Sequence, residues 1–336
     1  MDIFNPYYLQ IVMFFIINAI LGISIYFTLA SGQLSLGAAG FMSVGAYVGA
    51  LLSLKADLPI VVGILAGGFV AALVAVIIGL PTTRLKGLYL AIATLGFGEV
   101  VRVIFLNLDV TNGALGLSGI PSIPQELTNF AYEIDIDGFM GIDAVAWGNI
   151  MAIIILLIVL IFIIAFCVRI NNSRVGRAFA AIKADDHAAE LMGINVVYYK
   201  MMAFIIGAFI AGIGGGLYAH ITNFINPTDF SYHKVVQILL FPVFGGSNVV
   251  WGSVLGSFIL TLLPEVLRFL SDYRDIIYGA LLVILMAVRP DGILTESMVD
   301  KISRKLGFKK APYIPETQVL TERFEAYKRK QQDKQG

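Results

Sequence analysis

Long apolar runs separated by short polar stretches make up most of the chain. The runs cover residues 8–29, 33–54, 59–80, 87–106, 147–168, 201–222, 235–263 and 276–289. About 20 apolar residues in a helix cross the hydrocarbon core of a bilayer, where a chain must satisfy its own backbone hydrogen bonds. The unbroken run 147–168 lacks the alternation of a membrane β-strand. The pattern therefore predicts an all-α, polytopic bundle of transmembrane helices.

One of these runs is interrupted in its middle. Residues 235–263 contain the stretch FGGSN, which includes Gly245 and Gly246. Glycine weakens a helix and permits a sharp turn. The run is therefore predicted to cross the membrane twice or to re-enter it, which gives about nine spans in a range of about eight to ten.

Charge is distributed unevenly along a chain that is 58% hydrophobic and 14% charged, with a mean hydropathy of +0.85. Lys and Arg lie in 81–86, in 169–200 and in the polar tail 296–336, whereas 107–146 is acidic and has none. Cytoplasmic loops of membrane proteins are rich in Lys and Arg. We therefore expect a transmembrane domain over 1–295, a cytoplasmic tail, and 107–146 and the N-terminus outside.

The cytoplasmic stretch 169–200 contains more helix-forming residues than a plain connector needs. Asp185 or Asp186 suits the N-cap of a short helix, and Gly193 suits the position just after its end. Such a helix would lie at the membrane surface, where an attached motor could push on it. A solvated loop between two spans explains the same composition.

Two features inside the apolar runs allow both a structural and a functional interpretation. The run 33–54 is dense in Gly, Ala and Ser, which fits close helix packing or a broken helix along a solute path. Glu99 and Arg102 are three residues apart in another run, so they can pair. Because ionisable residues in a membrane are costly and usually functional, they indicate either a structural ion pair or a site at the outer mouth of a pathway.

Three sequence blocks, in order, resemble the branched-chain amino acid permeases of the LivM type. The first runs from Gly87 to Glu99 and reads GLYLAIATLGFGE. The second is SRVGRA at 173–178, and the third is the FGG of the interrupted run leading to WGSVLG at 251–256. The resemblance extends over residues 20–295, which is nearly the whole chain.

A shorter motif resembles the E-A-A-x-x-x-G signature of ATP-binding-cassette (ABC) importer permeases, although a histidine stands where the signature has Glu. In that family the signature marks a helix that docks on the ATPase. The resemblance implies a coupling helix formed by Asp185, Asp186, His187, Ala188, Ala189 and Gly193. It implies support in the same loop from Arg174, Gly176 and Arg177. Candidate residues of the translocation path are Ser35, Gly40, Phe41, Thr94, Phe97, Glu99, Gly245 and Gly246.

The resemblance also implies partners outside this chain. They are two cytoplasmic ATPase subunits that bind ATP and Mg²⁺, a sister permease of the LivH type and an extracytoplasmic solute-binding protein, in a bacterial inner membrane. The chain itself has no GxxxxGK[ST] phosphate loop, so we expect a transport subunit with no ATPase site, cofactor or metal of its own. The basic tail fits membrane lipid better than nucleic acid.

The sequence leaves both the transported solute and the transport mechanism open. The family favours leucine, isoleucine and valine, but relatives of the same architecture carry urea, other amino acids or small amides. A proton-coupled secondary transporter is the alternative to an ABC permease, and it would use Glu99 as the proton carrier. Such a carrier has no need of a surface helix at 185–193.

Overall fold

A computed structural model describes residues 6–133, 143–266, 279–280, 283 and 292–294 of the chain. All of them except Leu294 belong to one compact unit, Met1–Ile293, to which this description is confined. Six described helices are long and apolar enough to cross a membrane: α1 (Pro6–Ala30), α2 (Ala38–Lys55), α3 (Ile60–Thr82), α4 (Leu88–Asn107), α6 (Ala144–Asn171) and α9 (Val196–Thr222). The predicted all-α membrane bundle is confirmed.

The interrupted run forms two helices that meet at a sharp bend. The chain bends by 118° between helices α10 (Tyr232–Gly245) and α11 (Val250–Val266), which together count as one broken span or a re-entrant loop. The predicted break at Gly245 and Gly246 is therefore confirmed. The predicted run 276–289 lies outside the described residues except at 279, 280 and 283, so the total of about nine spans stays a prediction.

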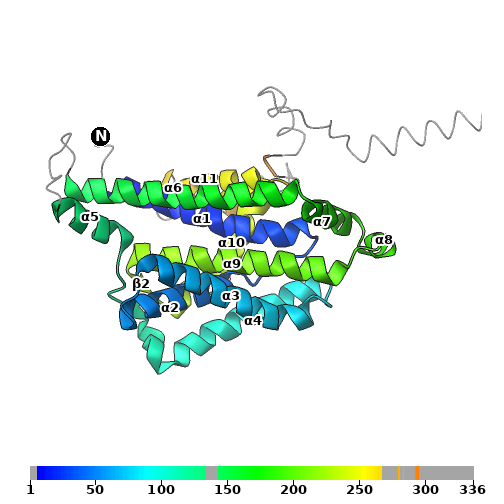
Figure 1. The fold of residues 1–336 in the computed structure, drawn as a ribbon, viewed down its shortest axis with the longest axis horizontal. Coiled ribbons are helices and arrows are strands. Elements are labelled where there is room, and N and C mark those ends of the chain that lie inside the picture. Colours follow the sequence, from blue (N-terminus) through cyan, green and yellow to red (C-terminus); the bar gives the residue numbers. More distant parts are fainter. Residues whose placement is uncertain (1–5, 134–142, 267–278, 281–282, 284–291, 295–336) are drawn as a thin grey trace, which may run out of the picture. The chain divides into compact units, whose positions relative to one another are not determined.

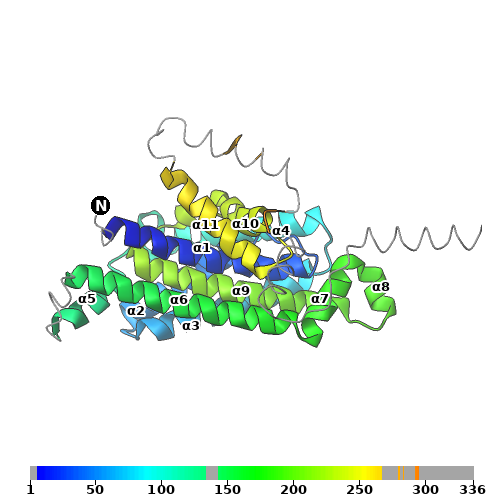
Figure 2. The ribbon, with the colours of Figure 1, turned by 90° about the horizontal axis from the view of Figure 1, so that it is seen from above.

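Helix α9 lies at the centre of the bundle, where it packs against α1, α2 and α3. Figures 1 and 2 show α1, α6 and α9 running alongside one another, and Figure 1 shows α2, α3 and α4 on the other side of α9 from α6. Helices α10 and α11 pack against α1, and α4 packs against α2. Helix α4 therefore borders the bundle with one side turned outward.

Small residues let the central helices approach closely. A Cβ added at Gly212 of α9 would lie 2.7 Å from the Cβ of Ala71 on α3, and one at Gly45 of α2 would overlap the Gly212 carbonyl. Close helix packing therefore explains the small residues of α2. The helix is continuous from Ala38, and the predicted break in 33–54 is limited to the non-helical residues 33–37 that precede it.

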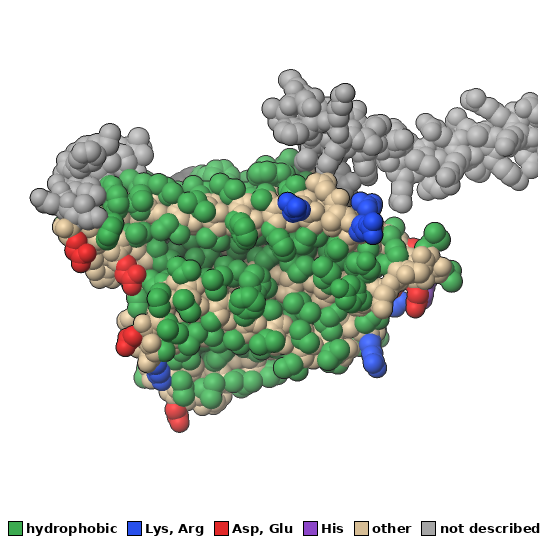
Figure 3. Space-filling view, viewed as in Figure 1, with side chains coloured by type: hydrophobic (Ala, Val, Ile, Leu, Met, Phe, Trp, Pro, Cys, Tyr) green, Lys and Arg blue, Asp and Glu red, His purple; other side chains and the backbone are tan. Residues whose placement is uncertain are grey.

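Large apolar side chains cover the outward faces of α3, α4 and α6. On α3 they recur every four residues, at Val61, Leu65, Phe69, Leu73 and Ile77. Figure 3 shows an apolar surface between two ends, with most Lys and Arg side chains towards the end where α7 and α8 lie and most Asp and Glu side chains towards the opposite end, where α5 lies. This surface is the one expected of a protein that faces lipid or a partner subunit within the membrane.

The long connection after α4 is more structured than its acidic composition indicated. It contains the short helices η1 (Asp109–Thr111) and η2 (Gly113–Leu115), strand β1 (Leu117–Ser118) and helix α5 (Ile123–Glu133). Helix α5 packs against α6. Strand β1 pairs antiparallel with β2 (Phe224–Ile225), which follows α9 and precedes η4 (Pro227–Phe230). The sequence predicted only an outer loop for 107–146.

Candidate functional site

The stretch between α6 and α9 folds into two helices, α7 (Arg174–Ala184) and α8 (Asp186–Leu191). Asp185 is the N-cap of α8, and its Oδ1 accepts hydrogen bonds from the backbone N–H groups of His187 (2.9 Å) and Ala188 (3.1 Å). A capping carboxylate satisfies donors that a helix start otherwise leaves free. The predicted short helix and its cap are therefore confirmed.

The other end of α8 closes on a glycine. Gly193 has a φ of +82°, and its N–H donates to the carbonyl of Glu190 at 2.9 Å. The N–H of Ile194 donates to the carbonyl of Ala189 at 3.1 Å. This pair of bonds is the Schellman arrangement, which requires a left-handed residue at this position. Gly193 therefore fixes where α8 ends.

The helix presents two large apolar side chains to solvent at its end. Leu191 is 88% exposed and Met192 is 83% exposed, whereas Ala189 is buried against the protein. Figure 1 shows α8 beyond the ends of α6 and α9. Adjacent exposed apolar side chains are a feature of protein and membrane interaction sites.

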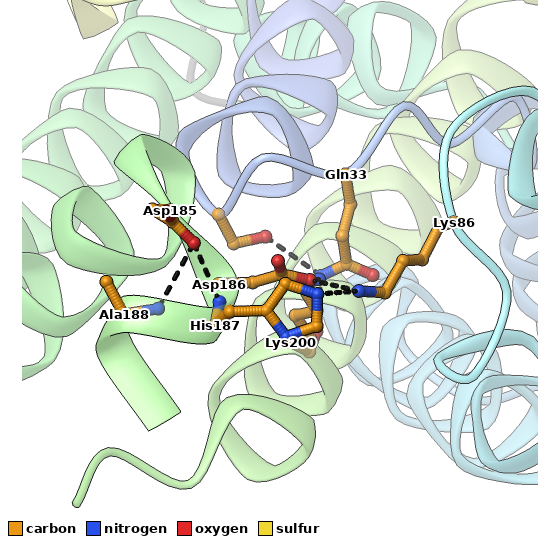
Figure 4. Close-up of polar contacts among 8 residues, drawn as sticks. Gln33, Lys86, Asp185, Asp186, His187, Ala188 and Lys200 are labelled. Atoms are coloured by element: carbon orange, nitrogen blue, oxygen red, sulfur yellow. Dashed lines mark hydrogen bonds and ion pairs between the residues drawn. The ribbon is translucent and has the colours of Figure 1, made fainter. Parts of the chain in front are cut away.

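Asp186 ties α8 to two membrane helices. Its Oδ2 lies 2.9 Å from Nζ of Lys86, in the turn before α4, and 3.4 Å from Nζ of Lys200 in the first turns of α9. Figure 4 shows these side chains converging, with His187 beside Lys86. Gln33 joins the cluster by donating from Nε2 to the carbonyl of Lys200 at 2.9 Å.

The charge balance of this cluster favours an ionised Asp186. The hydrogen bond from Lys86 lowers the pKa of Asp186, and the nearby charge of Lys200 lowers it further. A lowered folded-state pKa means that the contribution of this group to stability is present above its unfolded pKa and is lost as pH falls through the lowered value. The ion pairs of Asp186 with Lys86 and Lys200 are therefore formed at neutral pH.

Three residues predicted to support the loop lie on α7. Arg174 and Arg177 are exposed on the surface of the helix. Gly176 lies against the end of α6, where an added Cβ would overlap the carbonyl of Asn171. The N-cap of α7 is Ser173, whose Oγ accepts from the N–H of Val175 at 3.1 Å. The glycine is thus needed for packing, and the two arginines are free to meet a partner.

Helix α4 links this charged cluster to the predicted path residues. Thr94 of α4 accepts a hydrogen bond from the backbone N–H of Leu36 at 2.9 Å. The rings of Phe41 and Phe97 lie 4.9 Å apart, and a Cβ added at Gly40 would lie 2.8 Å from the Cα of Gly98. Ser35 is buried beside them. The structure therefore brings Ser35, Gly40, Phe41, Thr94 and Phe97 together in a closed α2–α4 seam.

We expect Thr94→Val to loosen this seam. Valine keeps the shape of threonine but leaves the partly buried N–H of Leu36 without its acceptor, which costs up to about 1–3 kcal/mol. The free energy of unfolding, measured by denaturant titration in detergent, should fall by that amount. Thr94→Ser keeps the hydroxyl and serves as the control, so equal stability of the two variants would contradict the proposed bond.

The remaining path candidates lie elsewhere. Gly245 and Gly246 form the bend between α10 and α11, and a Cβ at Gly245 would overlap the carbonyl of Gly252. Glu99 pairs with Arg102, whose Nε donates to Oε1 at 2.9 Å. This confirms the predicted pair. Both side chains line a cavity of about 400 Å³.

The walls of that cavity come from two parts of the sequence. Helix α4 provides Leu95, Gly98, Glu99 and Arg102, and the η4–α10 connection provides Phe230, Ser231, Tyr232, His233 and Val235. The sequence singled out only the charged pair of α4. The second wall depends on the fold bringing η4 against α4, and no local pattern in the sequence signals that.

Comparison with known proteins identifies the family. A family described as "branched-chain amino acid transport system / permease component" matches residues 7–286. The chain belongs to this permease family. The match includes every helix of the bundle, α8 and both walls of the cavity, so these features are parts of a permease-family fold.

Individual relatives agree with the family. The LivM permease protein of a high-affinity branched-chain amino acid transport system from Salmonella typhimurium (strain LT2) is 32% identical over 272 residues. The alignment covers 79% of this chain but only 64% of that relative, which is less than two thirds of its length. LivH of Escherichia coli (strain K12) is 30% identical over 154 residues, 45% of this chain and 50% of LivH. A probable LivM from Methanocaldococcus jannaschii is 24% identical over 260 residues, 71% of this chain and 69% of that protein. No solved structure matches the chain.

Proposed function

We propose that this chain is the membrane-spanning permease subunit of an ABC importer that moves branched-chain amino acids into the cytoplasm. Membership of the permease family and the names of the LivM and LivH relatives support this. The observation that carries it is α8, a short capped helix that presents Leu191 and Met192 to solvent and is tied by Asp186 to the membrane helices. A carrier without a motor does not need such a helix.

The partners follow from this role. Two cytoplasmic ATPase subunits bind ATP and Mg²⁺, and one of them receives α8 in a surface groove. A sister permease of the LivH type completes the pathway against the exposed membrane faces of this chain. An extracytoplasmic binding protein delivers the solute to the acidic end around α5, in the inner membrane of a bacterium. The C-terminus is cytoplasmic and the N-terminus outside, as the Lys and Arg distribution indicates.

Alternating access then depends on movement of α4. Closure of the ATPases moves α8, and the Asp186–Lys86 pair passes this motion to the turn before α4. Helix α4 carries the closed seam near Thr94 and Phe97 and the open cavity near Glu99. A small displacement of α4 can therefore open one region while it closes the other.

The test is ATP hydrolysis by the complete complex in liposomes, with leucine-loaded binding protein outside. Gly193→Arg places a long cationic side chain at a left-handed position next to the docking end of α8, so we expect stimulated hydrolysis to fall to the basal level. Gly193→Asn is the control, because Asn tolerates a left-handed backbone. It should keep most of the stimulation.

Each outcome decides between the two transport mechanisms. Loss in the Arg variant with retention in the Asn variant supports coupling through α8. In the proton-coupled alternative, Glu99 is the proton carrier. Its carboxylate lies within an apolar helix, and its side chain is 46% exposed. Leucine uptake by this chain alone, without ATP and in step with a proton gradient, would overturn the importer proposal.

A further inference from the structure

The cavity beside Glu99 lies well inside the membrane-spanning part of α4. Glu99 follows Leu88, the first residue of α4, by 11 positions, which is about 17 Å along a helix. Its side chain is 46% exposed and that of Arg102 is 22% exposed. Because a charged side chain is costly in hydrocarbon, both groups must face water, a solute or a partner there. An open cavity provides that environment.

The cavity combines opposite charges with an apolar wall. Glu99 and Arg102 lie side by side on one edge, three residues apart on α4. Phe230 and Val235 are almost fully buried within the opposite wall, and Leu95 completes the apolar lining. The volume of about 400 Å³ falls within the range of small-molecule sites. Such a lining suits a small ligand with two charges at one end and an aliphatic group at the other.

The first turn of α10 adds to the positive side of the cavity. Ser231, Tyr232 and His233 line it, and the side chain of Ser231 does not cap the helix. The first N–H groups of a helix have no acceptor within the helix, and its start carries a partial positive charge. Helix starts that point into a transporter cavity contact anionic groups of substrates. Here they reinforce the guanidinium of Arg102.

We propose that this cavity binds the zwitterionic head of a free α-amino acid. Glu99 receives the α-ammonium, Arg102 and the first turn of α10 receive the α-carboxylate, and the aliphatic side chain lies against Leu95, Phe230 and Val235. This inference rests on the proposed importer function and names the solute contacts within it.

The ion pair itself explains how such a site can exist when no solute is bound. A charge without a partner is costly within the membrane-spanning region, and Glu99 and Arg102 neutralise each other when no solute is bound. A zwitterion inserted between them replaces one internal pair by two pairs with the ligand. Urea and neutral amides cannot form either pair, so the site selects free amino acids among the solutes that this architecture carries.

Photolabelling tests the site directly. The complete complex in lipid nanodiscs, without binding protein, is irradiated with photo-leucine, a diazirine analogue of leucine. We expect label on α4 or on the η4–α10 connection. Excess L-leucine should remove it, whereas 4-methylpentanoate, which lacks the ammonium, and 3-methylbutylamine, which lacks the carboxylate, should not. Equal competition by all three would overturn the inference.

Variants separate recognition from folding. Glu99→Gln and Arg102→Gln should lower the specific labelling at least about tenfold, because each removes one partner of a charged hydrogen bond to the ligand. Glu265→Gln is the matched control, since it neutralises a carboxylate on α11 that does not line the cavity. Leu95→Trp fills the apolar end with the charges intact and should also abolish labelling. Wild-type labelling in the Glu99, Arg102 and Leu95 variants would contradict the site.

The same variants distinguish this inference from the importer proposal. ATP-dependent leucine uptake together with labelling that does not respond to Glu99 or Arg102 substitutions would refute the site and leave the importer function standing. Uptake that needs no ATPase would refute the importer function whatever the labelling shows.

Discussion

Gly215→Ala is expected to prevent stable folding of the bundle. Gly215 lies on α9 where it crosses α2, and an added Cβ would overlap the carbonyl oxygen of Met42. The neighbour is backbone, so no side-chain rotation can relieve the overlap. Overpacking typically costs about 1–3 kcal/mol, and separation of two central helices should cost at least that. The yield of monodisperse protein in detergent and its melting temperature measure the effect.

Gly96→Ala on α4 provides the matched control. Gly96 is also a helical glycine in a predicted span, but a Cβ added there meets nothing within 4 Å. Alanine is favoured over glycine in a helix by up to about 1 kcal/mol. We expect the control to fold as well as wild type or slightly better. Equal melting temperatures for Gly215→Ala and Gly96→Ala would show that α2 and α9 do not approach as closely as described.

The sequence predicts the helices of the bundle because the signals for them are local. Apolar runs of about 20 residues suffice to place a span. The bend between α10 and α11 also follows from neighbouring residues, since Gly245 and Gly246 interrupt one run. Helix α8 was predictable for the same reason, because Asp185 and Gly193 form its caps within a few residues of its ends.

Contacts between distant segments could not be predicted in this way. Nothing near Asp186 in the sequence indicates that Lys86 lies beside it. The pattern also could not separate path residues that seal the α2–α4 seam, such as Phe41 and Phe97, from Glu99, which lines a cavity. Helix α5 was missed because its polar, acidic stretch reads as a loop unless its packing on α6 is known.

Charge reversal at Asp186 should abolish both the stimulated ATP hydrolysis and the transport. Asp186→Lys places three ammonium groups together, because Lys86 and Lys200 already surround this position. The repulsion should separate α8 from the turn before α4. We expect binding-protein-stimulated hydrolysis and leucine uptake to fall to near the basal level, while ATPase subunits still copurify through Leu191 and Met192.

Exchanging the two charges of the pair tests whether the contact between Asp186 and Lys86 carries the motion. Lys86→Asp combined with Asp186→Lys re-forms one ion pair between α8 and the turn before α4, so it should recover a large part of the stimulation. Lys86 is 62% exposed, and exposed ion pairs contribute at most about 1 kcal/mol to stability. The melting temperature should therefore change little in either variant. A single variant that is as active as wild type, or a double variant that is as inactive as the single one, would show that motion reaches α4 by another contact.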